Sequence, residues 1–445
     1  MKEPNASKAA GSEDLNRKSI RDKAGDPGGE RRKQSAELAE KMREDDVNNK
    51  WKTLLSAALL SSVMPLTALA QGGPLKILVL DDMSGIFAAN GGPGTLMAVQ
   101  MAVEDAGGKV LGRSIEILQA DHQNKPDVGS AQAQRYIQEQ GVRAITLGGS
   151  SAVGLAAQAR AAEAKVFTLA SGAYAPNFSE AQCSPYGFQF APSTQELSRA
   201  VTSRIVGEGK KTWHMIVADY VFGHSLRDDA TKSITAAGGK VLGQTLHPLN
   251  SNDMASALLT AQGSGADVIG LANAGTDLET TVKQAAQFGL GGKLAAMMVY
   301  ENNIEALSLA ASKGMRMSVS TYWDLNDKTR ALAKRMMAKN GGKTPTMGHM
   351  GAYGAVTHYL EAVKAVGTDD PDKVAAKMRE LPITTGIWEN PRIQANGRVT
   401  YDMLLVEVKD PSESKGPNDL YKIIAKIPAE GLFRAAKDSG CPFVK

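Results

Sequence analysis

Short apolar runs alternate with longer, helix-like stretches along the chain from residue 75 onward. The apolar runs have the length and composition of buried parallel strands and lie at residues 75–81, 114–120, 144–147 and 166–169. The helix-like stretches between them lie at residues 95–105, 129–140 and 152–164. Strands that alternate with crossover helices predict a doubly wound α/β lobe.

The same alternation occurs a second time from residue 194. Its expected helices lie at residues 194–207, 225–236, 253–262 and 277–288, and its expected strands at 212–218, 241–247, 268–271 and 294–299. The heptapeptide Ala-Gly-Gly-Lys-Val-Leu-Gly occurs in both halves, at residues 106–112 and 237–243, with the same order of elements around it. Paired glycines after a helix are ordinary capping chemistry, so convergence would explain the heptapeptide alone. The matching order of the flanking elements favours two related lobes.

The later elements predict that the chain crosses between the lobes several times. Helices at 329–339 and 353–366 are expected in the first lobe, and a hairpin at 393–408 in the second. The predicted N-terminal lobe is 71–193 plus 325–385, and the predicted C-terminal lobe is 194–324 plus 386–445. The expected fold class is therefore α/β, with two doubly wound, Rossmann-like lobes joined by a multi-strand hinge.

Residues 50–70 carry the parts of a secretory signal. Lys50 and Lys52 precede a short apolar run at 54–64, and Ala68-Leu69-Ala70 forms a small-residue cleavage site. The run is too short for a stable membrane anchor, which needs about 20 apolar residues. We therefore predict cleavage after Ala70 and a periplasmic protein.

Residues 1–49, upstream of this signal, are polar and charged, a composition that cannot bury a core. Two explanations stay open. Either translation begins later, near Met42 or Val47, or the segment is a genuine disordered extension. Neither changes the expected fold of the mature chain.

Charge and cysteine content narrow the partners and the compartment. The formal net charge of +4 over 445 residues gives no indication of nucleic acid or an anionic membrane as partner. Cys183 and Cys441 are the two cysteines of the chain. In an oxidising compartment they are expected to form a disulfide that fastens the C-terminal tail, with two free thiols as the alternative. We expect a monomer.

Sequence motifs for catalysis and cofactor binding are absent. The chain has no G-x-G-x-x-G dinucleotide fingerprint, no G-x-x-x-x-G-K-[ST] phosphate loop, no H-E-x-x-H zinc motif and no G-x-S-x-G nucleophile elbow. His358 and Glu361, three residues apart on a helix, are better explained as a solvated face than as metal ligands. We therefore predict a protein that is not an enzyme and uses no cofactor or metal.

Small polar turns after two first-lobe strands predict an anion site. Gly148-Gly149-Ser150-Ser151 precedes a helix, whose N-terminal N–H groups and dipole favour a carboxylate. Ser171-Gly172-Ala173-Tyr174 follows the next strand. Each serine alone would be explained equally well as a helix cap. Two such turns at neighbouring strand ends favour one carboxylate site at the edge of the sheet.

The second lobe places aromatic and polar side chains after its strands. Tyr220 and Phe222 share one turn, Asn273 lies in another, and Tyr300-Glu301-Asn302 follows the last strand. Aromatic residues make up only 5% of the chain, so their position at strand ends predicts a wall for an apolar or aromatic ligand body. Packing within a turn is the alternative for any one of them.

Several stretches together resemble one family. They are Ser84-Gly85 with the glycine turn that follows, residues 106–112, Ser150-Ser151, residues 219–223 and residues 267–275. In these stretches the chain from about residue 75 to its end resembles the periplasmic solute-binding proteins of the leucine/isoleucine/valine-binding type, which serve ATP-driven (ABC) importers. The resemblance implies the type I periplasmic binding fold, two lobes that close on a ligand without covalent chemistry, and a membrane permease as partner.

The resemblance also implies roles for individual residues. Those that match the carboxylate-holding turns are Ser150 or Ser151, Gly172, Ala173 and Tyr174. Those that match contacts with the rest of the ligand are Asn90, Phe222 and Glu301.

One departure bears on the ligand. Amino-acid binders commonly carry a threonine after two small residues, where this chain has Tyr174. Residues 121–125, residues 322–326 and the Gly440-Cys441-Pro442 tail resemble a branch linked to the uptake of aromatic acids. The departure puts an α-amino acid ligand in doubt.

We therefore expect an extracytoplasmic receptor that binds a small organic acid, either an aromatic acid or a branched-chain amino acid or amide, and delivers it to an ABC permease. A cytosolic ligand-sensing regulator on the same fold is the first alternative, and the signal at residues 50–70 argues against it. An exported hydrolase is the second, and the missing nucleophile–base or metal set argues against it.

Overall fold

The structure is a computed structural model that describes residues 72–444. The predicted signal at residues 50–70, its cleavage after Ala70 and the segment at 1–49 lie outside the described residues. Between residues 72 and 444, no helix combines the length and the apolar character that a membrane span requires.

The first sheet has six strands in the order β2-β3-β1-β4-β5-β6. They are β1 (Leu75–Asp81), β2 (Lys109–Val110), β3 (Arg113–Asp121), β4 (Ala144–Leu147), β5 (Phe167–Ala170) and β6 (Gly187–Gln189). All pair in parallel except the short β2, which runs antiparallel to β3. β1 lies between β3 and β4, and nearly all of its side chains are buried, as expected for a central parallel strand.

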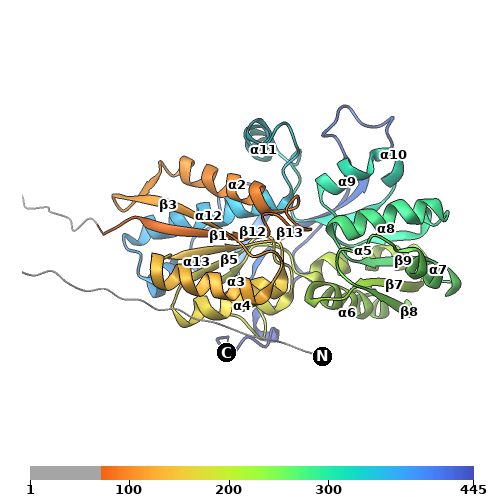
Figure 1. The fold of residues 1–445 in the computed structure, drawn as a ribbon, viewed down its shortest axis with the longest axis horizontal. Helices are drawn as coiled ribbons and strands as arrows, with labels where there is room; N and C mark the ends of the chain where they lie inside the picture. Colours follow the sequence, from red (N-terminus) through yellow and green to blue (C-terminus); the bar gives the residue numbers. More distant parts are fainter. Residues whose placement is uncertain (1–71, 445) are drawn as a thin grey trace, which may run out of the picture. The chain divides into compact units, whose positions relative to one another are not determined.

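Helices cover both faces of this sheet (Figure 1). On one face α2 (Gly92–Asp105) packs against α12 (Met347–Val366), and on the other α3 (Pro126–Arg135) packs against α4 (Ser151–Glu163). α11 (Asp327–Lys339) also contacts α2, and α13 (Pro371–Glu380) contacts α12. This arrangement is the doubly wound lobe that the strand–helix alternation predicts.

The second sheet has four parallel strands in the order β10-β9-β7-β8. They are β7 (Thr212–Ala218), β8 (Lys240–His247), β9 (Val268–Ala272) and β10 (Leu294–Ala296). The helices of this part are α5 (Thr194–Gly207), α6 (Val221–Ala236), α7 (Ala255–Gly263), α8 (Gly275–Gln287), α9 (Glu301–Leu307) and α10 (Leu309–Ser312). α5 packs against α6, and α8 against α9. The predicted fold class, with two α/β lobes, is confirmed.

A third, antiparallel sheet is formed by β11 (Arg316–Val319), β12 (Glu389–Ile393), β13 (Val399–Val408) and β14 (Tyr421–Ile427). β12 and β13 form the hairpin predicted at residues 393–408. Its turn contains Gly397 at φ +79°, and a Cβ there would overlap the Gly187 carbonyl of β6. Only glycine fits this conformation and this close approach to the first sheet. The residue boundaries of the two lobes stay a prediction.

Some element ends differ from the predicted ones. α2 begins at Gly92 rather than at residue 95, because Pro93 suits the first helical turn. α12 begins at Met347 rather than at residue 353, because Thr346 and His349 form a capping box at its N-terminus. β10 ends at Ala296 rather than at residue 299. Elements absent from the prediction are mostly short, with too few residues to show a period: β2, β6, β11, β14, α9, α10 and α13.

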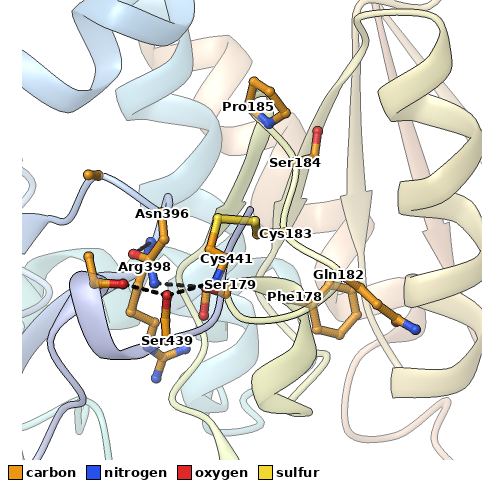
Figure 2. The surroundings of a disulfide bond; sticks show 12 residues. Phe178, Ser179, Gln182, Cys183, Ser184, Pro185, Asn396, Arg398, Ser439 and Cys441 are labelled. Carbon is orange, nitrogen blue, oxygen red and sulfur yellow. Dashed lines mark hydrogen bonds between the residues drawn. A yellow bond between two sulfur atoms is a disulfide. The ribbon is translucent and has the colours of Figure 1, made fainter. Parts of the chain in front are cut away.

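The predicted disulfide between Cys183 and Cys441 is present, with the two Cα atoms 5.7 Å apart (Figure 2). It ties the C-terminal tail to the loop that precedes β6 of the first sheet. In the same region the Asn396 side chain donates to the Ser179 carbonyl at 2.8 Å. The tail and the β12–β13 turn are therefore both attached to the first lobe beside β6.

Replacing both cysteines with alanine should lower the free energy of unfolding by about 2–5 kcal/mol. The reason is that the bond joins residues 258 positions apart and so restricts the unfolded chain. Denaturant unfolding of the oxidised wild type and of the Cys183→Ala, Cys441→Ala double variant measures the difference. Equal unfolding midpoints for the two proteins would contradict a stabilising role for the bond.

Candidate ligand-binding site

A cavity of about 20 Å³ lies where the carboxyl ends of strands from both lobes face each other. Its walls come from the turns that follow β1, β4, β5, β7, β9 and β10, with one residue from α12. The lining residues are Phe87, Asn90, Gly91, Thr95, Gly149, Ser150, Ser151, Gly172, Tyr174, Tyr220, Phe222, Ala274, Met298, Tyr300 and Gly348. This space holds one or two water molecules, because aromatic side chains from both lobes occupy most of it.

Helix N-termini from both lobes end at this cavity. The residues that cap α2, α4, α6, α8 and α9 line it, together with the first turn of α12. α2, α4, α6 and α8 have no side-chain cap, so N–H groups of their first turns lack partners within the helix. The partial positive charges of these helix ends favour an anion.

Cationic side chains are absent from the described walls of this cavity. Among the residues that the structure describes, none of those lining the cavity is charged. The positive potential at the cavity therefore comes from backbone dipoles rather than from lysine or arginine.

Polar donors face the cavity from the first lobe. Ser151 Oγ accepts the N–H groups of Tyr174 and Ala175, both at 3.1 Å, and so ties the turn after β4 to the turn after β5. Its own hydroxyl proton is left for another acceptor. Ser150 Oγ and Asn90 Nδ2 are buried and have no hydrogen-bond partner within residues 72–444. A bound carboxylate would satisfy these donors.

Aromatic side chains close the cavity from both sides. The Tyr300 hydroxyl of the second lobe donates to the Tyr174 hydroxyl of the first, and Tyr174 meets Phe222 edge-on with ring centroids 6.2 Å apart. Phe87 stacks on Tyr220 at 6.0 Å. Burial raises the pKa of the Tyr174 and Tyr300 hydroxyls, so both stay protonated and remain available as donors.

Asn90 adds a polar contact between the lobes at the edge of the cavity. Its Oδ1 accepts Nδ2 of Asn302 at 2.9 Å. Its backbone carbonyl accepts the Thr346 hydroxyl, the cap of α12, at 3.1 Å. Asn90 is thereby held by both lobes while its Nδ2 group stays without a partner.

The structure brings most of the predicted ligand-binding residues together. Those that line the cavity are Asn90, Ser150, Ser151, Gly172, Tyr174, Tyr220 and Phe222. Ala173 is buried and does not line it, because its side chain points toward α4 near Gly154. Asn273 does not line it either: its Nδ2 donates to Thr281 Oγ1 at 3.0 Å inside the second lobe.

Glu301 is the third predicted residue that does not line the cavity, although Tyr300 next to it does. It opens α9, is 1% exposed, and neither carboxyl oxygen has a hydrogen-bond partner within the described residues. Burial raises the pKa of Glu301 to about 8. The side chain is therefore a neutral carboxylic acid at neutral pH.

Eight cavity residues are absent from the predicted ligand-binding set: Phe87, Gly91, Thr95, Gly149, Ala274, Met298, Tyr300 and Gly348. Phe87 offers a usable signal, since it is one of few aromatic residues and lies in the turn after β1. Gly348 offers none, because it lies in the first turn of α12, before residue 353 where the helix is predicted to begin.

The sequence model of a periplasmic binding protein family matches residues 74–417. A crystal structure of a periplasmic binding protein from Burkholderia mallei is 39% identical, with a TM-score of 0.81, over 84% of this chain and 99% of that chain. A branched-chain amino acid ABC transporter periplasmic ligand-binding protein from Burkholderia xenovorans is 32% identical, with a TM-score of 0.75, over 83% and 100% of the two chains. A solute-binding protein of an R. palustris ABC transporter, in complex with benzoate, shares the fold at 22% identity, with a TM-score of 0.73, over 83% and 100%.

Glu301→Gln should make the protein more resistant to alkaline pH. The pKa of Glu301 rises from 4.5 to about 8 on folding, so the unfolded chain loses this proton first. The group therefore lowers stability as pH rises from 4.5 to about 8, and its effect is constant above that. The free energy of unfolding of wild type and variant is compared below and above this pH window. From the lower to the higher pH, the variant should gain a few kcal/mol of stability relative to wild type. A difference that does not change with pH would contradict the buried neutral carboxyl.

Proposed function

Because this chain belongs to the periplasmic binding protein family, we propose that it is an extracytoplasmic receptor that binds a small carboxylate between its lobes and delivers it to an ABC permease. One observation carries the proposal. The cavity at the facing strand ends is ringed by helix N-termini and lined, within the described residues, by no charged side chain. Such a site suits one delocalised negative charge.

The first-lobe wall supplies the carboxylate end of the proposed site. The uncapped N-terminus of α4, the hydroxyl of Ser150 and the amide of Asn90 are donors without partners in the described residues. A helix N-terminus contributes about 0.3–1 kcal/mol to binding an anion, and up to about 2 kcal/mol where the site is partly buried. Several such ends and two hydroxyl or amide donors together support binding without a cationic side chain.

The second-lobe wall supplies the ligand's apolar end. Tyr220, Phe222 and Met298 line it, with Phe87 opposite. A flat, apolar ring system matches these surfaces. We therefore favour an aromatic acid over an α-amino acid, whose ammonium group would meet no acidic side chain among the lining residues.

A branched-chain amino acid or amide is the second candidate ligand. Glu301 favours an amino acid ligand. It follows the lining residue Tyr300 in the sequence, and its carboxyl has no hydrogen-bond partner among the described residues. An ammonium group could pair with it only after the side chain turned toward the cavity and lost its proton. That requirement places the amino acid second.

Closure of the lobes is the proposed signal to the permease. The Tyr174–Tyr300 hydroxyl pair, the Asn90–Asn302 pair and the Phe87–Tyr220 stack all join the two lobes at the cavity. Opening would break each of them, and a ligand held by both lobes would favour the closed population. The cavity of about 20 Å³ is smaller than an aromatic acid, so a bound acid has to displace the tyrosine pair or hold the lobes further apart.

A thermal-shift panel on the mature chain tests the proposal. We expect benzoate, 4-hydroxybenzoate or 3,4-dihydroxybenzoate to stabilise the protein, by about 2.7 kcal/mol at about 100-fold the Kd. Benzamide is the matched neutral control and should stabilise far less, because the helix ends act on charge. Leucine tests the second candidate. A panel without any stabilising acid, or stabilisation by benzamide equal to that by benzoate, would count against the proposal.

Ser150→Ala should weaken binding of the stabilising acid about tenfold while leaving the free protein as stable as wild type or more so. The variant removes a buried hydroxyl that has no partner in the described residues, worth about 1.5 kcal/mol when it is paired with a charged group. Ser198→Ala is the control, since Ser198 is buried in α5 and its hydroxyl bonds the Gln195 carbonyl away from the cavity. If calorimetric titration gives the Ser150→Ala variant wild-type affinity for the acid, Ser150 does not contribute to ligand binding.

A further inference from the structure

A buried carboxyl lies directly behind the first-lobe wall of the cavity. Asp81 ends β1, the central strand of the first sheet, and its side chain is completely buried. Its Oδ1 accepts the N–H of Asp82 at 2.8 Å. Oδ2 has no partner in hydrogen-bond geometry among the described residues, although the Thr95 hydroxyl and the Gly92 N–H lie near enough to the carboxyl to lower its pKa. Buried polar atoms in proteins nearly always have a partner. The orphan oxygen therefore calls for a physical reason.

Three glycines make room for this carboxyl. A Cβ at Gly148 would overlap Oδ2, a Cβ at Gly91 would lie 2.8 Å from Oδ2, and a Cβ at Gly149 would lie 2.8 Å from Oδ1. Gly91 and Gly149 both line the cavity. The backbone of these two turns and the side chain of Thr95, which also lines the cavity, separate the Asp81 carboxyl from the space between the lobes.

No cation neutralises Asp81 in the part of the chain that the structure describes. Its basic neighbour is His122, which directly follows β3; His122 Nδ1 lies 3.0 Å from the Asn124 backbone nitrogen, and Nε2 lies 3.0 Å from the Gly148 carbonyl oxygen. The N–H of Asn124 donates to Nδ1, and Nε2 faces the Gly148 carbonyl. Both ring nitrogens of His122 are therefore used in these turns, and neither bonds the Asp81 carboxyl.

The other groups around Asp81 are acidic or hydroxylic. The neighbouring carboxylates are used in their own turns: Asp82 accepts the N–H groups of Gly85 and Phe87, and Asp121 accepts the Met83 N–H and the Ser84 hydroxyl. The Thr95 hydroxyl of α2 lies beside the carboxyl, and the hydroxyls of Tyr174 after β5 and Tyr300 before α9 lie near enough to interact with its charge. Burial raises the pKa of Asp81 above its usual range.

We infer that the cavity accommodates one negative charge at a time, so that an anionic ligand binds only with Asp81 protonated. The inference rests on the proposed function for the charge of the ligand. With no ligand, the helix N-termini at the cavity partly offset the effect of burial, so Asp81 ionises, at a pH above the usual range of an aspartate. A ligand carboxylate on the other side of the Gly91 and Gly149 backbone would repel an ionised Asp81. Asp81 is the weaker acid of the two, so it takes up a proton from solvent at Oδ2.

The direction of the pH dependence follows. Below the pH at which Asp81 ionises in the free protein, affinity for the acid is constant. Above it, each bound ligand brings in one proton, and affinity falls about tenfold per pH unit. The receptor thus binds organic acids more tightly in an acidic medium than in an alkaline one, as long as the acid itself stays ionised.

The probe for this inference is benzoate, titrated calorimetrically between about pH 5 and about pH 9 in pairs of buffers with different ionisation enthalpies. We expect the wild type to take up close to one proton per benzoate at the alkaline end, and Asp81→Asn to take up none and to bind with the same affinity throughout. Asp229→Asn is the matched control, since Asp229 is a buried carboxyl with a raised pKa outside the cavity. It should keep the wild-type proton uptake.

Three results overturn the inference: no proton uptake by the wild type, uptake retained in Asp81→Asn, or uptake lost equally in Asp229→Asn. Carboxyl ¹³C spectra of wild-type protein need no variant, and one buried aspartate should change from ionised to protonated when benzoate is added. If benzoate does not bind at all, the proposed aromatic-acid function fails. The ¹³C titration of the free protein then tests the inference separately. An aspartate that titrates at elevated pH in wild type but is missing from Asp81→Asn supports the one-charge cavity. Ordinary titration midpoints for all aspartates overturn it.

Discussion

The direct connection of each parallel strand to the helix that follows it positions the site proposed for the ligand. Each parallel strand leads into a helix whose N-terminus lies at the carboxyl edge of the sheet. The two parallel sheets face each other along these edges, which gathers the uncapped ends of α2 and α4 from one lobe and of α6 and α8 from the other around one cavity. A site for a negative charge therefore arises from the backbone itself, and among the described residues its walls carry no lysine or arginine.

The same walls hold the lobes together. Tyr174 and Tyr300 contact each other through their hydroxyls, and Asn90 reaches Asn302 across the cavity edge. Under the proposed function, a ligand that enters between them exchanges these contacts for its own, so that ligand affinity and lobe closure depend on the same side chains. The disulfide and the β12–β13 turn attach the tail and the antiparallel sheet to the first lobe beside β6, away from the cavity. In a cavity that holds one negative charge at a time, Asp81 makes ligand affinity depend on pH.

Residues that follow a strand directly were predictable, because strand ends are readable from short apolar runs and the turn chemistry lies beside them. Ser150, Gly172, Tyr220 and Phe222 reach the cavity for this reason. Sequence position does not determine which way a turn side chain points, so Asn273 is directed into the second lobe, where Thr281 offers a partner. Gly348 comes from a helix that returns from residue 347 to the first lobe, a long-range packing effect that local pattern does not contain.

The position of the ligand's charged group tests the account most directly. A crystal structure of the mature protein with the acid that stabilises it best should place the carboxylate at the N-terminus of α4, within hydrogen-bond distance of Ser150, with no lysine or arginine in contact. A carboxylate bound at the second-lobe wall, or held by a cationic side chain, would contradict the claim that backbone dipoles form the anion site.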